Sequence, residues 1–165
     1  MSLRMFSTRN VTRLPFRNGI AFTTLACWSR LTNRKALTAA RSLKRRSLLP
    51  GSPVPLAVVP FDALAAYDRA FHPTPRAAFL QAWIQLPQSH ALGWWQDGAL
   101  RGYGVIRACV EGFKLAPLCA DTPAIADALF DALCARVPQA EPDFMDVPEC
   151  NPLATQLALR QGMEA

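Results

Sequence analysis

The spacing of apolar residues divides the chain at the turn-rich segment 49–53, Leu-Pro-Gly-Ser-Pro. Before this segment no helical or strand period is sustained, so the pattern predicts no regular element there. After it, residues 54–59 form a short apolar run broken by Pro55, which predicts an edge strand. We therefore expect a folded domain over residues 54–165, preceded by a disordered basic tail over residues 1–50.

Two helices are predicted next, because apolar residues return at spacings of three and four. The first covers residues 62–71 and ends at the prolines that follow, since proline cannot continue a helix. The second covers residues 75–83 and begins with a proline, a residue that the first helical turn tolerates. Its buried face is expected to carry Phe79 and Trp83.

From residue 91 the period becomes two, which predicts strands over residues 91–95, 99–109 and 113–120, joined by glycine-containing turns. One side of the second strand is expected to carry Leu100, Gly102, Gly104 and Ile106. Two glycines on one face indicate that something packs close to the backbone. A helix is the favoured partner, and a ligand is the alternative.

The last elements are a helix, a strand and a second helix. The first helix begins at Thr122-Pro123, and its Asp127 and Asp131 are expected on a solvated face. A short strand follows over residues 143–147, and Asn151 caps the final helix.

If the strands at 113–120 and 143–147 are neighbours, the helix between them forms a right-handed β-α-β crossover. The fold class is therefore predicted as α+β, a mixed sheet with antiparallel hairpins and one crossover.

Charge is segregated along the chain. The first 61 residues hold eleven Lys and Arg and no acid, whereas residues 62–165 hold seven basic and twelve acidic residues, a balance of −5. The domain itself therefore gives no reason to expect nucleic-acid binding. The five cysteines form no CxxC pair and only two histidines are present, which argues against a zinc site.

The basic stretch at residues 1–50 has several possible explanations. Its composition, rich in arginine and hydroxyl residues and free of acids, is typical of an organelle transit peptide. A secretory signal and a nucleic-acid arm fit less well, because the apolar patch is short and aromatic residues do not alternate with the basic ones. The abrupt change of composition also fits an out-of-frame segment upstream of the domain.

Several segments, in this order, resemble the GNAT N-acetyltransferases, in particular the second, degenerate domain of tandem members. They are Pro75-Arg-Ala-Ala-Phe-Leu-Gln-Ala-Trp83, Gly102-Tyr-Gly-Val-Ile-Arg107, Gly112-Phe-Lys-Leu-Ala-Pro-Leu-Cys-Ala-Asp121, Asp146-Val-Pro-Glu-Cys-Asn151 and Gln161-Gly-Met163. The resemblance implies transfer of an acetyl group from acetyl-CoA to a small amine.

The resemblance also implies where the cofactor lies. The thioester is expected between the strands at 113–120 and 143–147, and the pyrophosphate where the first of them enters its helix. Leu118, Ala120 and Asn151 are then the candidate cofactor-binding residues, and Glu149 and Tyr103 the candidate catalytic ones. Glu149 would act as a base or hold the amine, and Tyr103 would act as a general acid.

The sequence departs from the family pattern at the pyrophosphate loop. Active members carry glycines there, but this loop, residues 118–124, has none. Pro123 lacks an N–H and Asp121 adds a negative charge, so both oppose anion binding. The resemblance therefore predicts an accessory domain that binds acetyl-CoA poorly by itself and works beside a complete first GNAT domain.

Other expectations follow from the same comparison of residues. The sheet is expected to be incomplete at the C-terminus, with an open edge. A binding module without chemistry and a non-functional fragment are the alternatives to a transferase. No apolar run approaches the ~18 residues of a membrane span. A cytoplasmic protein with no membrane and no nucleic-acid partner is therefore expected.

Overall fold

A computed structural model describes residues 20–21, 28–33, 49–72, 74–138, 140–148 and 150–164. The elements, in chain order, are β1 (Ile20–Ala21), β2 (Trp28–Asn33), β3 (Ser52–Pro55), the 3-10 turn η1 (Leu56–Val58), α2 (Phe61–Arg69), α3 (Ala77–Ile84), β4 (Ser89–Gln96), β5 (Ala99–Ala108), β6 (Phe113–Ala120), α4 (Pro123–Cys134), β7 (Asp143–Pro148) and α5 (Pro152–Arg160).

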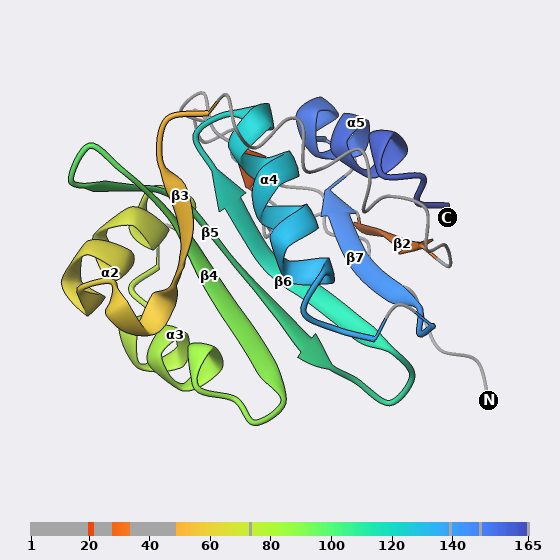
Figure 1. The fold of residues 1–165 in the computed structure, drawn as a ribbon, viewed down its shortest axis with the longest axis horizontal. Helices are drawn as coiled ribbons and strands as arrows, with labels where there is room; N and C mark the ends of the chain where they lie inside the picture. Colours follow the sequence, from red (N-terminus) through yellow and green to blue (C-terminus); the bar gives the residue numbers. More distant parts are fainter. Residues whose placement is uncertain are drawn as a thin grey trace.

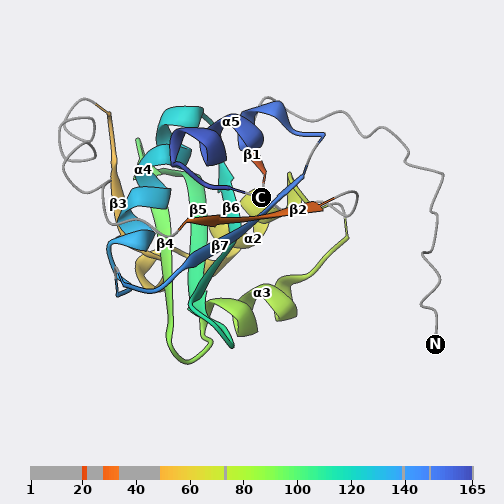
Figure 2. The same ribbon diagram turned by 90° about the vertical axis from the view of Figure 1, so that its right-hand side faces the viewer.

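A single mixed sheet organises these elements. Its strand order is β2-β7-β6-β5-β4-β3, and β1 pairs with β6 beside this path. All pairings are antiparallel except that of β6 with β7, which α4 connects as a crossover. Helices α4 and α5 cover one face, and α2 and α3 cover the other (Figures 1 and 2). The predicted α+β class and the crossover are confirmed.

The glycines of β5 lie directly under α4. A Cβ atom added at Gly102 would approach Ile125 and Leu129 to 3.0 Å, and one added at Gly104 would approach Leu133 Cδ1 to 2.8 Å. The close partner of this strand is therefore a helix, as the sequence favoured. Glycine allows the backbone of β5 to sit against α4 without a gap.

Leu100 does not share the face of these glycines. The pairing of β4 with β5 shifts register between Trp94 and Trp95, because Trp94 pairs with Gly102 while Trp95 pairs with Leu100. An extra residue in one strand turns the side chains beyond it to the other face. Leu100 consequently packs in the cluster formed by α2 and α3, and the prediction for this residue is wrong.

The buried residue of α3 is Leu80, which is 1% exposed. Phe79, predicted to be buried, is 48% exposed, and its ring stacks on that of Trp83 at 5.1 Å. In this eight-residue helix the side chains that pack in the core are those of Leu80 and Ile84, which are four residues apart. The prediction of the buried face is corrected accordingly.

Asp127 also departs from its prediction, because it is 6% exposed instead of solvated. Its carboxylate accepts hydrogen bonds from Arg160 Nη2 at 3.1 Å and Gln161 Nε2 at 3.2 Å. These residues lie at the end of α5, so the aspartate joins the two helices of that face. A buried charge is tolerated when its partners are in place.

The N-terminal stretch contributes two strands, although its sequence shows no strand period. β2 pairs with the outer edge of β7 along its whole length. The sequence predicted an open edge of the sheet, and at β7 this prediction is wrong, because β2 covers the edge. The other residues before Leu49 lie outside the described part, and their assignment to a targeting segment stays a prediction. Among the described helices, none combines the length and apolar character of a membrane span.

Candidate functional site

The parallel strands β6 and β7 separate after a short paired region. Their register joins Phe113 to Asp143 and Leu115 to Met145, and no pairing continues beyond this point in the described residues. An irregularity in β6 coincides with the separation, since β5 pairs with Leu115 and then with Leu118. The two strands therefore diverge toward their C-terminal ends, from which the chain continues into α4 and α5.

A salt bridge lies at the closed end of this opening. Lys114 Nζ approaches Asp146 Oδ2 to 2.5 Å, and both side chains are about a quarter exposed. The pair ties β6 to β7 just where their backbone pairing ends. It places a charged group of each sign beside the opening on the face of α2 and α3.

The N-terminus of α4 offers few donors to an anion. Pro123 has no N–H, the Ile125 N–H donates to Thr122 Oγ1 at 3.3 Å, and the Ala126 N–H donates to Thr122 O at 3.1 Å. Among the first three helical residues, this leaves the N–H of Ala124. A phosphate site at a helix N-terminus uses several such donors, and the predicted weakness of the loop stays a prediction.

Asp121, two residues before α4, has partners in α2 and β5. Its Oδ1 lies 2.8 Å from the hydroxyl of Tyr67 in α2, and its Oδ2 lies 3.6 Å from Arg101 Nη1. Burial and the neighbouring Asp121 both raise the pKa of Tyr67, so the phenol stays protonated and donates. The negative charge that the sequence analysis set against phosphate is thus partly offset by its partners.

The predicted cofactor-binding residues occupy different positions around the opening. Leu118 is fully buried. A Cβ atom added at Gly104 would lie 2.9 Å from Leu118 Cδ1 and 2.8 Å from Leu133 Cδ1, so both leucines pack against this glycine. Ala120 is fully buried, and its backbone pairs with β1. Asn151 Oδ1 accepts a hydrogen bond from the Ala154 N–H at 3.2 Å, so the residue caps α5 as predicted.

Of the two predicted catalytic residues, the structure describes Tyr103. Glu149 lies outside the described residues. Tyr103 is fully buried, and its hydroxyl donates to Asp68 in α2. Burial and the nearby Cys119 and Asp68 raise the pKa of Tyr103 well above its usual value. This phenol holds its proton tightly, which does not favour a general acid.

A polar network surrounds Asp68 that the sequence pattern did not predict. The carboxylate accepts hydrogen bonds from Arg76 Nε at 2.8 Å and Arg76 Nη2 at 2.6 Å, and His72 Nδ1 lies 3.0 Å away. Burial alone would raise the pKa of Asp68, but the interactions with Arg76, His72 and Tyr103 outweigh it and lower that pKa. Asp68 lies in the last turn of α2, His72 follows that helix and Arg76 precedes α3, so the four-residue spacing of these residues across the helix connection was the available signal.

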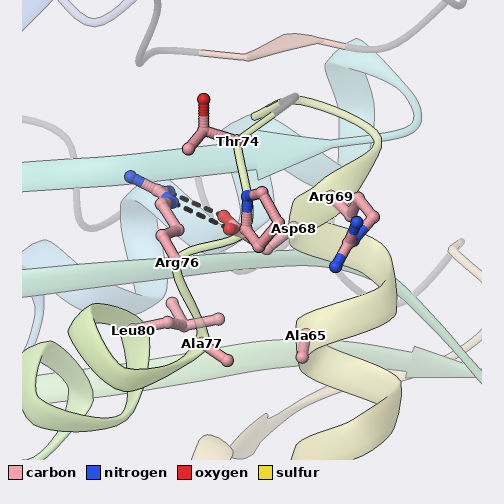
Figure 3. Close-up of a pocket in the computed structure, with 8 residues that line it drawn as sticks. Ala65, Asp68, Arg69, Thr74, Arg76, Ala77 and Leu80 are labelled. Atoms are coloured by element: carbon pink, nitrogen blue, oxygen red, sulfur yellow. Dashed lines mark hydrogen bonds and ion pairs between the residues drawn. The ribbon is translucent and has the colours of Figure 1, made fainter.

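The network borders a small pocket between α2 and α3 (Figure 3). The pocket encloses about 40 Å³, which suffices for water but not for a cofactor. Figure 3 shows the Arg76 guanidinium turned onto the Asp68 carboxylate. This contact joins the start of α3 to α2. Within the described chain, no group of three or more potential metal ligands gathers in one place.

Trp83 marks the opening on this same face. Its indole N–H donates to the Ala116 carbonyl at 3.0 Å, next to the point where β6 leaves β7. The guanidinium of Arg107 covers the indole at 4.9 Å, a cation–π contact. Trp83 therefore contacts β6, and Phe79 stacks on its outer side, half exposed.

Comparison with protein-family models decides the family. The acetyltransferase (GNAT) domain model matches residues 64–165 of the chain. The chain belongs to the GNAT family. The matched region begins in α2 and includes the whole β6-α4-β7 unit around the opening.

Individual relatives of this GNAT domain are distant. Holothin acyltransferase from Pseudoalteromonas sp. (strain SANK 73390) is 30% identical over 87 residues, which is 53% of this chain. The match spans 30% of that protein's length. A solved GNAT acetyltransferase from Colwellia psychrerythraea superposes with a TM-score of 0.61 at 15% identity, covering 88% of this chain and 60% of that one.

A second solved structure, the aminoglycoside 6′-N-acetyltransferase from Enterococcus faecium, gives a TM-score of 0.47 at 17% identity. It covers 52% of this chain and 53% of the other. At 15% identity, the Colwellia psychrerythraea structure shows that this chain has the GNAT fold.

Proposed function

We propose that this GNAT chain is the accessory, C-terminal-type domain of an acyl-CoA-dependent N-acyltransferase, in which a complete GNAT domain performs acetyl transfer to a small amine. The observation that carries the proposal is the N-terminus of α4, where Pro123 and the Thr122 cap leave the N–H of Ala124 for an anion. A glycine-free loop of this kind binds the cofactor's pyrophosphate poorly.

Family membership supports the acyl-transfer part of the proposal. The opening between β6 and β7 is where an extended acyl-CoA arm would bind, and Trp83 and the Lys114–Asp146 pair lie beside the point where the two strands separate. The name of the related holothin acyltransferase also refers to acyl transfer. The partner domain and the amine acceptor are part of the proposal.

Calorimetric titration of acetyl-CoA into the full chain tests the cofactor loop. We expect no binding tighter than millimolar for the unchanged chain. Pro123→Ala restores one N–H at α4, and a hydrogen bond to a charged group contributes about 1.5–3 kcal/mol, roughly a ten- to hundredfold gain in affinity. Pro152→Ala is the matched control, because Pro152 holds the same first position in α5.

The two variants separate the loop from general effects on helix stability. A gain for Pro123→Ala without one for Pro152→Ala supports the proposed defect. Micromolar binding by the unchanged chain, together with release of free CoA in the presence of small amines, would mean that this domain is itself a working transferase.

A further inference from the structure

We infer that strand β1 occupies part of the cofactor groove in this chain and competes with acyl-CoA for the edge of β6. The inference rests on the proposed function, because it concerns the same opening between β6 and β7. It adds a regulatory element that the proposed function does not include, namely a segment from the basic N-terminal stretch.

The first observation is the position of β1. β6 pairs with β5 along one edge, while its other edge loses β7 after Leu115. β1 takes up this second edge near the end of the strand, with Ile20 opposite Ala120 and Ala21 opposite Cys119. It also contacts α5, beside which it lies in Figure 2. Because it pairs with the edge of β6 that β7 has left, it lies in the opening.

The second observation is the position of β2, which continues the same stretch. β2 runs antiparallel to β7, from Trp28 opposite Pro148 to Asn33 opposite Asp143. The N-terminal stretch therefore contacts both strands that border the opening: β1 pairs with β6 and β2 pairs with β7. Residues 20–21 and 28–33 are thus paired on either side of the candidate cofactor groove.

Competition follows from the chemistry of a strand edge. The backbone N–H and C=O groups on one edge of a strand pair with one neighbour at a time. The arm of acyl-CoA is an extended chain that carries amides, so it would need the groups of Cys119 and Ala120 that face β1. Ala120 is one of the residues that the sequence analysis assigned to the cofactor.

The strength of the competition is set by two opposing factors. β1 is part of the same chain, so its effective concentration at β6 is high. Its pairing covers two residues, so it remains reversible. If acyl-CoA binds only chains in which β1 has left the edge, its apparent affinity is its intrinsic affinity multiplied by the fraction of such chains. We expect that factor to be roughly tenfold.

The test uses the full chain and a double substitution in β1. Ile20→Pro/Ala21→Pro removes both backbone donors of the strand and disfavours its pairing. Ala39→Pro/Ala40→Pro makes the same change in the basic stretch outside β1 and β2. Amide hydrogen exchange of residues 118–120 reports release of the edge, and calorimetry with acetyl-CoA reports binding. Ile20→Gly/Ala21→Gly provides a milder version if the proline variant does not fold.

The expected result is faster exchange at residues 118–120 and about tenfold tighter acetyl-CoA binding for the β1 variant, with neither change in the control. Unchanged exchange would overturn the inference, because β1 would not then cover the edge. Faster exchange with no gain in affinity over the control would also overturn it. The Pro123→Ala experiment is independent of β1, so failure of the proposed function is seen separately.

Discussion

Two aspartates on opposite sides of the sheet show how differently its faces are built. Asp68, on the side of α2 and α3, has Arg76 and the Tyr103 hydroxyl as partners, and its pKa lies below the usual value. Asp143, beside Cys134 at the end of α4, has a buried oxygen without a hydrogen-bond partner. Burial raises the pKa of Asp143 from 3.8 to about 6, although the hydrogen bond with Cys134 lowers it.

The difference separates two ways of fixing a helix on this sheet. α4 is held by apolar contacts from Leu129 and Leu133 against the glycines of β5. α2 and α3 are held by a smaller apolar cluster together with the network around Asp68 and the Tyr67–Asp121 contact. The stability of apolar packing does not depend on pH, whereas the stability of a charged network depends on the protonation state of its members.

The largest effect is expected for Asp68→Asn. The substitution removes the charge that Arg76 faces in a site where the carboxylate side chain is 4% exposed. Removing one partner of a buried pair costs about 3 kcal/mol, because the other charge is left uncompensated. Chemical denaturation at pH 7 should show this loss relative to the unchanged chain, and Glu141→Gln, at an exposed carboxylate, should change stability by less than about 0.5 kcal/mol.

The sign of the pH dependence gives a second reading of the same variant. The folded-state pKa of Asp68 is lowered, so its contribution is present above the ordinary carboxyl pKa and is lost as the pH falls below about 4. The stability difference between the unchanged chain and Asp68→Asn should therefore shrink in acid. A difference that is equally large at pH 3 and pH 7 would mean that the charge is not responsible.

The sequence predicted the elements of the α4 face well because their signals are local or periodic. Thr122 and Asn151 were expected as helix caps, and both cap through their side chains. The glycine pair of β5 predicted a close helix without naming it. In these places one short stretch of chain contains the whole physical reason for its structure.

The predictions that failed depend on distant partners. One extra residue in β5 moved Leu100 to the other face, and Asp127 became buried because Arg160 and Gln161 reach it from α5. The strand pairing of β1 and β2 had no local period to reveal it. The network at Asp68 joins α2, α3 and β5, and periodicity within any one of them does not predict it.

A medium effect is expected for Gly104→Ala on the α4 face. The new Cβ would lie 2.8 Å from Leu133 Cδ1 and 2.9 Å from Leu118 Cδ1, so the core must shift, at a cost of about 1–3 kcal/mol. Combining it with Leu133→Ala should give a coupling that offsets part of this cost. Leu80→Ala, a buried leucine under the other helices, should add to Gly104→Ala without coupling. Equal coupling to both leucines would show that the two faces are not packed independently.

The smallest effect, and one of opposite sign, is expected for Asp143→Asn. The raised folded-state pKa means that the stabilising contribution of the protonated carboxyl is complete below its ordinary pKa and is lost as the pH rises through about 6. The asparagine is neutral at every pH, so at pH 7 the variant should be more stable by about 1 kcal/mol. This value allows for solvent screening at a partly open site. Denaturation of both proteins between pH 4 and pH 7 should show the variant gaining stability over the unchanged chain as the pH rises. In the Asp68→Asn comparison it is the unchanged chain that gains as the pH rises. A variant less stable than the unchanged chain at pH 7 would indicate that the Asp143 carboxylate has a compensating partner, as Asp68 does.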